Sequence, residues 1–135
     1  MPEVNILAVA AAAVSAFLLG GLWYSPVLFA KKWMAYTGNE CAEGEKPKGN
    51  MALIFGGAFV LNLVAAYVLA IFLGPLPLKF GALYGLAVGL CWVATSFGVN
   101  DLFERRPLGL WLINAGYAIL QYTLMGTIIG AFNAV

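Results

Sequence analysis

The chain has no histidine and very few charged side chains. Its 135 residues include seven Lys or Arg and six Asp or Glu, so that 10% are charged, while 63% are hydrophobic. Without His, the commonest proton shuttle and metal ligand is missing. Cys41 and Cys91 belong to no metal-spaced set, and the sequence has no phosphate loop, nucleophile elbow or zinc-protease motif. We therefore expect no enzyme, no metal and no cofactor, and the net charge of +1 indicates no nucleic-acid partner.

The few charges are clustered and leave four long uncharged stretches. These lie between Glu3 and Lys31, between Lys48 and Lys79, between Lys79 and Asp101, and after Arg106. Each stretch exceeds the ~20 residues that a helix needs to cross a bilayer. A surface without charges is stable where lipid replaces water, and in lipid the backbone must satisfy its own hydrogen bonds. Each stretch therefore predicts a transmembrane helix.

The predicted helices cover residues 5–30, 51–74, 79–103 and 107–132. We predict an all-α fold, in which residues 1–135 form a single integral membrane domain, a four-helix transmembrane bundle with antiparallel neighbours. The first stretch also contains the small residues of a secretory signal peptide. Its beginning has no Lys or Arg, however, and its apolar run is longer than such a peptide needs, so we favour a membrane span.

The basic residues predict how the bundle is oriented. The loops at 31–50 and 104–106 fall on the same side of the membrane and carry Lys31, Lys32, Lys46, Lys48, Arg105 and Arg106. The other side has Lys79 as its one basic residue. The positive-inside rule therefore places both loops in the cytoplasm and both termini outside. The segment 38–50 is polar and interrupted by Gly and Pro, and we expect it to be mobile.

Small residues recur four apart in every predicted helix and indicate how the helices pack. The rows are Ala8, Ala12, Ala16 and Gly20; Ala58, Asn62, Ala66 and Ala70; Gly81, Gly85 and Gly89; and Gly126 and Gly130. A period of four lies near one helix face, and small residues let helix backbones approach closely in lipid. The row at Gly81, Gly85 and Gly89 fits packing within the chain or a homodimer interface, and we favour packing within the chain.

Uncharged polar side chains inside the predicted spans are candidates for a functional layer. Asn62, Gln121, Thr95 and Ser96 lie near mid-span, whereas Tyr24, Ser25, Asn100 and Asn114 lie in the cytoplasmic half. A polar group in hydrocarbon needs a hydrogen-bonding partner, so these side chains are expected to face inward. We favour bonds between helices over the alternative, a shallow polar pocket open to the cytoplasm. Cys91 is expected to be a small core residue.

The string Trp23-Tyr24-Ser25-Pro26 predicts a kink in the first helix. Pro26 has no N–H to donate to the carbonyl of Leu22. That carbonyl then needs another donor, for which the side chains of Tyr24, Asn100 and Asn114 are candidates. The kink shapes the end of the helix, and in the alternative interpretation it opens a cleft.

The string from Asn100 to Pro107 predicts a charged turn at the cytoplasmic surface. Asp101 and Arg105 are four residues apart and are expected to pair on one helix face, which leaves Arg106 to reach anionic lipid headgroups. We favour a topological anchor with a local ion pair. The alternative is a phosphate- or carboxylate-binding site at the membrane surface, because Arg is a bidentate donor.

These strings together resemble a known family. The resemblance covers the first helix with Trp23-Tyr24-Ser25-Pro26, Phe29 and Lys32-Trp33-Met34, the string 100–107, and Leu110-Trp111-Leu112-Ile113-Asn114-Ala115-Gly116-Tyr117 with Met125-Gly126. It is to the bacterial family called domain of unknown function 1761. Relatives often have His after the Gly-Tyr pair, where this chain has Ala118. The resemblance implies a small multi-pass protein of the bacterial inner membrane and implies no activity.

Three functions stay open at this point, and the least favoured of them is a membrane enzyme, because the chain has no His and no acid deep in a predicted span. The favoured one is an accessory or structural membrane protein, whose partners are the bilayer, anionic headgroups and, as an option, a second copy of the chain. The alternative is a transporter or channel for a small solute, with Asn62, Asn100, Asn114 and Gln121 along its path. Such a protein would work without proton coupling, because no acid lies deep in a predicted span.

Overall fold

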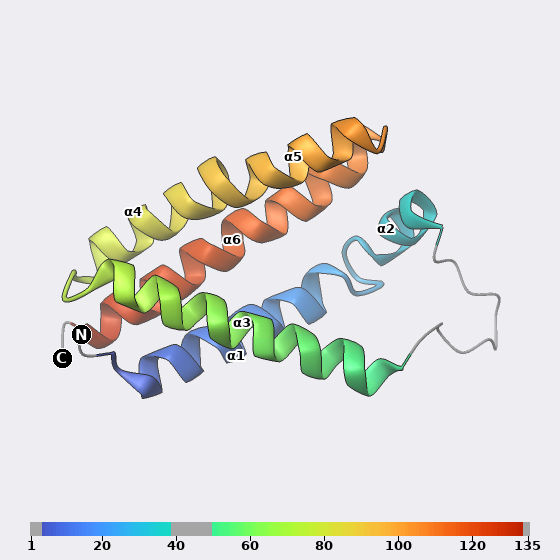
Figure 1. Ribbon diagram of the computed structural model, residues 1–135. Helices are drawn as coiled ribbons and strands as arrows, with labels where there is room; N and C mark the ends of the chain where they lie inside the picture. The colour runs from blue at the N-terminus through green and yellow to red at the C-terminus, as the bar shows by residue number, and fades with distance from the viewer. Residues whose placement is uncertain (1–3, 39–49, 134–135) are drawn as a thin grey trace.

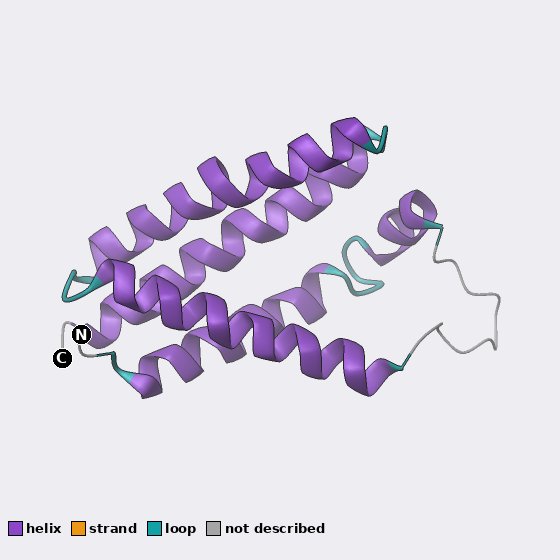
Figure 2. Cartoon of the chain, in the orientation of Figure 1, coloured by secondary structure: helices purple, strands orange, loops and turns teal. Residues whose placement is uncertain are grey.

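The protein is described by a computed structural model, which covers residues 4–38 and 50–133. The helices are α1 (Ile6–Trp23), α2 (Ala30–Thr37), α3 (Met51–Leu73), α4 (Leu78–Val88), α5 (Ala94–Phe103) and α6 (Leu108–Asn133), and a π-helical segment, Gly89–Val93, connects α4 to α5. Within the described residues there is no strand, so the all-α prediction is confirmed (Figure 2). The mobile segment predicted at 38–50 lies, apart from its two ends, outside the described residues.

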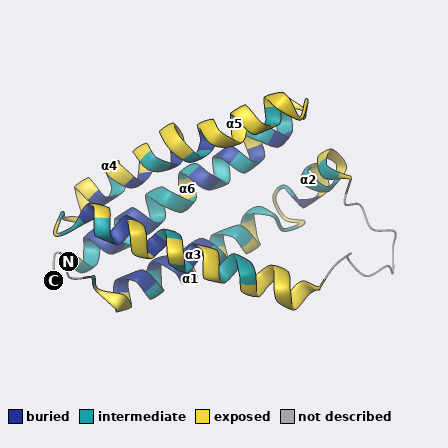
Figure 3. Cartoon of the chain, viewed as in Figure 1, coloured by how far each residue is buried: buried dark blue, intermediate teal, exposed yellow. Residues whose placement is uncertain are grey.

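Four helices are long and apolar enough to cross a membrane, which indicates a multi-pass membrane protein. They are Ile6–Trp23, Met51–Leu73, Leu78–Phe103 and Leu108–Asn133. Large apolar side chains cover the outer faces of these helices, where Phe72 is 72% and Leu53 is 72% exposed. In Figure 3 exposed residues follow the outer side of α4 and α5, whereas α6 is mainly intermediate and buried. Lipid is the surrounding that such outer faces require.

The first predicted helix, 5–30, is wrong at its C-terminal end. Helix α1 ends at Trp23, the chain turns through residues 24–29, and α2 follows as a separate short helix (Figure 1). The carbonyl oxygen of Leu22 accepts bonds from the backbone N–H and the hydroxyl of Ser25, at 3.1 and 2.6 Å. Ser25 therefore supplies the donor that Pro26 lacks. The side chains of Tyr24, Asn100 and Asn114, which were predicted as donors, do not bond this carbonyl.

Helix α6 is the helix against which the others pack. The glycine row of α4 lies on it so closely that a Cβ atom at Gly81 would meet the carbonyl of Gly126, and one at Gly85 would meet the carbonyl of Tyr122. At Gly89 a Cβ atom would lie 2.8 Å from the carbonyl oxygen of Ala118. The row thus packs within the chain, as favoured from the sequence, because small residues allow this backbone contact.

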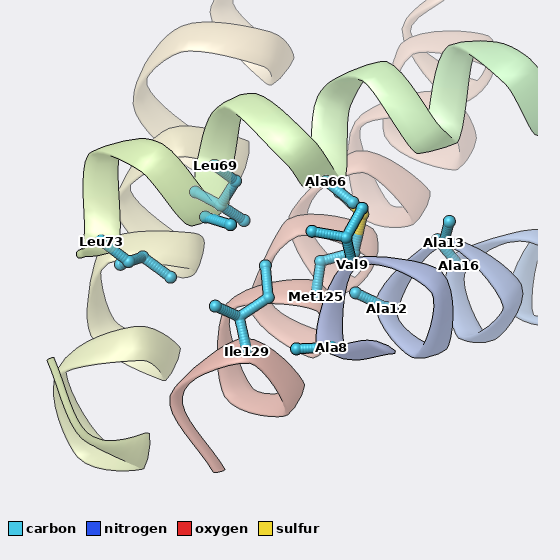
Figure 4. Close-up of a cluster of buried hydrophobic side chains, with 11 residues drawn as sticks. Ala8, Val9, Ala12, Ala13, Ala16, Ala66, Leu69, Leu73, Met125 and Ile129 are labelled. Carbon is cyan, nitrogen blue, oxygen red and sulfur yellow. The ribbon is translucent and has the colours of Figure 1, made fainter. Parts of the chain in front are cut away.

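The apolar core lies where α1, α3 and α6 meet (Figure 4). The predicted small-residue rows supply much of it, since Ala8, Ala12 and Ala16 of α1 and Ala66 and Ala70 of α3 are buried. Larger side chains fill the remaining space, and these are Val9, Leu69, Leu73, Met125 and Ile129. Asn62 is the buried polar residue on the same face of α3.

The third predicted helix, 79–103, carries an irregularity that the sequence did not predict. Between α4 and α5 the π-helical segment Gly89–Val93 widens one turn, and the N–H of Ala94 donates to the carbonyl of Gly89. The hydroxyl of Thr95 bonds the carbonyl of Cys91 at 2.7 Å, and that of Ser96 bonds the carbonyl of Trp92 at 2.6 Å. Both hydroxyls therefore satisfy backbone groups of their own helix.

Candidate functional site

One polar layer lies between α3 and α6 in the middle of the bundle. The amide of Gln121 donates to the Oδ1 atom of Asn62 at 2.6 Å, and the amide of Asn62 donates to the carbonyl of Ala58 at 3.0 Å. The hydroxyl of Tyr117 donates to the carbonyl of Ala16 at 2.9 Å. This layer therefore joins α1, α3 and α6 through hydrogen bonds.

A second polar layer lies where α1 ends. The indole of Trp23 donates to the carbonyl of Ile113 at 2.8 Å, and the hydroxyl of Tyr24 donates to the Oδ1 atom of Asn114 at 2.7 Å. The ring of Tyr24 packs edge-on against the rings of Trp33 and Tyr117, with centroids 5.6 Å apart in both pairs. The end of α1 is thus attached to α6 by aromatic side chains with polar ends.

Three polar residues of the third span do not face inward. Thr95, Ser96 and Asn100 are exposed, so the predicted inward orientation is wrong for them. Cys91 is also exposed rather than part of the core. The third span packs against α6 through the glycine face of α4. The residues on the other faces of the π-helical segment and of α5 therefore point away from the bundle and are exposed.

The turn between α5 and α6 differs from the predicted charged turn. Helix α5 ends at Phe103, and Arg105 has φ 57°, so Arg105 is no longer on a helix face with Asp101. Among residues 4–38 and 50–133 the ion pair found is Arg106 with Glu104, whose Nε and Oε2 atoms are 2.7 Å apart. The prediction that Asp101 pairs with Arg105 is therefore wrong. The backbone N–H of Arg106 donates to the carbonyl of Asp101 at 2.9 Å.

Helix α2 lies at the same end of the molecule as this turn. The hydroxyl of Tyr36 is in contact with Gly109 near the start of α6. Lys31 and Lys32 on α2 are exposed, as are Arg105 and Arg106 in the turn. We call these four cationic residues the basic end. Figure 1 shows α2 and the α5–α6 turn together, opposite the turn between α3 and α4.

An apolar groove of about 460 Å³ lies between α3 and α4. Its floor includes Leu69 and Leu73, which are 4% and 3% exposed, and its rims include Phe72, Tyr84 and Trp92, which are 72%, 48% and 64% exposed. The sequence predicted no such groove. Apolar residues that line a groove look the same in sequence as apolar residues that face lipid elsewhere.

The candidate residues thus divide into bonded pairs and an exposed end. Tyr24 with Asn114 and Asn62 with Gln121 are brought together by the fold, and Ser25 completes the end of α1. Within the described part of the chain no three His, Cys, Asp or Glu side chains lie close enough to hold a metal ion.

Comparison with known proteins gives one result. Neither the curated proteins nor the solved structures give a match. A family model does match residues 7–130, which is nearly the whole chain, and its description is protein of unknown function DUF1761. That range includes the two strings around Pro26 and Pro107 and nearly all residues of the four helices that are long and apolar enough to cross a membrane, so the chain belongs to the DUF1761 family.

Proposed function

We propose that this chain is an accessory protein of the bacterial inner membrane that binds anionic lipid headgroups through its basic end. The helices are antiparallel to their neighbours in this proposal, the basic end faces the cytoplasm, and both termini are outside. The protein carries out no reaction. The observation that carries the proposal is that two separate basic pairs, 31–32 and 105–106, are exposed at one end of the molecule.

The contacts between helices support this topology. Gly81 lies against Gly126, and Gly89, which comes later in the chain, lies against Ala118, which comes earlier. At the C-terminal end of α6, the amide of Asn133 donates to the carbonyls of Gly74 and Leu76 in the α3–α4 turn, at 2.8 and 2.9 Å. The end with the α3–α4 turn has Lys79 as its basic residue within the described chain, so the positive-inside rule favours a cytoplasmic basic end.

Charge and aromatic content support headgroup binding at that end. Each Lys or Arg near an anionic membrane surface contributes about 1 kcal/mol to attraction. Helix α2 carries Lys31 and Lys32 on its exposed side, while Trp33 is half-buried against Tyr24. A short helix with basic residues on one face and aromatic residues beside them is typical of the membrane interface.

The transport alternative has less support. A path lined by Asn62, Asn100, Asn114 and Gln121 would need these side chains to face a common space. Asn62 and Gln121 instead bond each other, Asn114 bonds Tyr24, and Asn100 is exposed. Hydrogen bonds between helices account for Asn62 and Gln121, and a bond to Tyr24 accounts for Asn114, as favoured from the sequence.

The double variant Arg105→Ala/Arg106→Ala tests the proposal. In nanodiscs that contain phosphatidylglycerol and phosphatidylcholine, native mass spectrometry measures which lipid stays bound. Two cations would contribute about 2 kcal/mol to the attraction, but Arg106 already pairs with Glu104 in a half-exposed ion pair. We therefore expect the preference for phosphatidylglycerol to fall by a smaller factor, about tenfold.

Lys79→Ala is the matched control, because it removes an exposed cation from the opposite end. It should leave the preference unchanged, and added salt should weaken the preference in the wild-type chain. An unchanged preference in the double variant, or an equal loss in Lys79→Ala, would contradict the proposal.

A further inference from the structure

The C-terminal end of α5 has a backbone geometry that favours glycine, but it carries an arginine. The N–H of Arg106 donates to the carbonyl of Asp101 at 2.9 Å, and the N–H of Arg105 donates to the carbonyl of Leu102 at 3.2 Å. These two bonds form a Schellman motif, in which the residue after the helix cap is left-handed and most often glycine. Arg105 occupies that position, with φ 57°.

The other helix ends of this kind follow the usual rule. In the part of the chain that the structure describes, the other residues with positive φ are Gly38 and Gly74, which end α2 and α3. A residue with a Cβ atom adopts left-handed backbone at a cost in free energy, and glycine does not. A backbone cost at one residue points to a function of its side chain. The end of α5 therefore directs attention to the guanidinium of Arg105.

The turn keeps this guanidinium free of local partners. Arg105 is exposed, and within the described residues the ion pair of the turn joins Arg106 to Glu104. Asp101 has one buried carboxylate oxygen without a hydrogen-bond partner there. In a continued helix Asp101 and Arg105 would lie on one face and could pair, whereas the left-handed turn separates them. The guanidinium is thus available to a group outside the chain.

Exposed apolar side chains place the turn at the edge of the hydrocarbon. Leu102 and Phe103, directly before the turn, are 80% and 85% exposed, and Leu108, directly after it, is 70% exposed. Such side chains are stable in lipid, so hydrocarbon reaches to within two residues of Arg105, which is roughly 3 Å along a helix. The headgroup layer on each side of a bilayer is roughly 5 to 7 Å thick. Arg105 therefore lies at the level of lipid phosphates.

We propose that Arg105 binds the phosphate of an anionic phospholipid through two parallel N–H bonds, and that the strained end of α5 is retained to present it. This inference rests on the proposed function, because it names the residue that recognises the headgroup. A guanidinium is a planar fork that fits two phosphate oxygens. The Nε atom of Arg106 is engaged by Glu104, so Arg105 has the free fork. Arg106, Lys31 and Lys32 contribute charge around it.

Lysine variants separate a direct contact from the effect of charge alone. Arg105→Lys keeps the charge and its favourable place at a helix C-terminus, but it loses the paired donors. In nanodiscs of phosphatidylglycerol and phosphatidylcholine, native mass spectrometry should show the preference for phosphatidylglycerol falling about threefold. Arg106→Lys is the matched comparison. It should lower the preference by less than about 1.5-fold, because Arg106 already pairs with Glu104.

Glycine and alanine at position 105 test the backbone cost. Both remove the guanidinium, and both should lower the preference about fivefold. Glycine alone relieves the left-handed backbone, so Arg105→Gly should unfold at a higher fraction of sodium dodecyl sulfate in mixed micelles than the wild-type chain or Arg105→Ala. A gain in stability together with a loss of binding is the result that a merely structural arginine would not give.

The outcomes distinguish this inference from the proposed function. An unchanged preference in Arg105→Ala/Arg106→Ala would contradict the proposed function, and the inference with it. A loss in that double variant with no loss in Arg105→Lys would mean that charge alone attracts the lipid, and the inference alone would be wrong. It would also be wrong if Arg105→Gly were no more stable than the wild-type chain. Displacement of phosphatidylglycerol by inorganic phosphate, beyond that by chloride at equal ionic strength, would show that Arg105 takes soluble phosphate instead.

Discussion

At the scale of single residues, the fold joins two pairs of polar side chains by hydrogen bonds. Asn62 is buried to 8% exposure among apolar side chains, and its Oδ1 atom receives the amide of Gln121. In hydrocarbon an amide without a partner costs more than its bond contributes, so the two residues depend on each other. Tyr24 and Asn114 form the corresponding pair where α1 ends.

This dependence predicts a coupling between Asn62 and Gln121. Asn62→Leu leaves the Gln121 amide without its acceptor, and we expect the free energy of unfolding in mixed micelles to fall by about 1 kcal/mol. Asn62→Leu/Gln121→Leu removes both partners and should be less destabilised than the sum of the single variants, by about 0.6 kcal/mol. Strictly additive effects in this double-mutant cycle would mean that the bond contributes nothing.

At the scale of helices, backbone contact between α4 and α6 distinguishes one pair from the others. Glycine at positions 81, 85 and 89 brings the two backbones together without intervening side chains. The π-helical segment begins at Gly89, and just beyond its end the carbonyl of Ala94 accepts a bond from the indole of Trp111 on α6 at 2.9 Å. The irregular turn is therefore held against α6 on both of its sides.

The close contact predicts opposite results for two glycines. Gly85→Ala places a methyl group against the backbone carbonyl of Tyr122, and we expect it to lower the free energy of unfolding by about 1 to 3 kcal/mol. Gly57→Ala in α3 has no atom within 4 Å of the new methyl group and should be neutral or slightly stabilising. Equal stability of the two variants, measured by unfolding in mixed micelles, would argue against the contact.

At the scale of the whole molecule, the two ends differ in charge. The basic end carries Lys31, Lys32, Arg105 and Arg106, and the end with the α3–α4 turn carries Lys79. The proposed orientation rests on this difference, since a cytoplasmic excess of Lys and Arg determines how short loops are placed.

Cysteine accessibility checks the orientation in a chain that carries Cys41→Ser and Cys91→Ser. A maleimide that cannot cross the membrane should label Lys79→Cys in intact cells, and label Lys32→Cys only after the cells are permeabilised. These positions lie at opposite ends of the bundle and both are exposed, so each serves as the control for the other. The reverse pattern would place the basic end outside.

Patterns that repeat along the chain predicted the positions of the helices and one of their contacts correctly. The spans 51–74, 79–103 and 107–132 agree with the observed helices to within one residue at each end, and the family resemblance is confirmed over residues 7–130. The glycine row also packs as favoured. Such features follow from composition and period alone, because a helix in lipid must be continuous, apolar and closely packed.

Predictions that needed the position of a single side chain were less successful. The end of the first helix was placed at residue 30 because the uncharged stretch reaches to Lys31, whereas α1 ends at Trp23 and Ser25 bonds its last turn. The pairing of Asp101 with Arg105 assumed that the helix continued past Phe103. Thr95 and Ser96 were expected to face inward, but a hydroxyl can bond its own helix and thus remain outside. Asn100 was expected to face inward as well and is exposed.

The sequence by itself determined that the chain has four helices long and apolar enough to cross a membrane, because charges spaced this far apart leave stretches that water solvates poorly. It also determined where backbones can touch, since small residues alone permit that contact. Only the tertiary structure decided which polar side chains meet, that the two basic pairs share one end, and that α3 and α4 leave a groove. Each of these depends on how far helices rotate and separate when they pack, and many rotations share the same hydrophobic period.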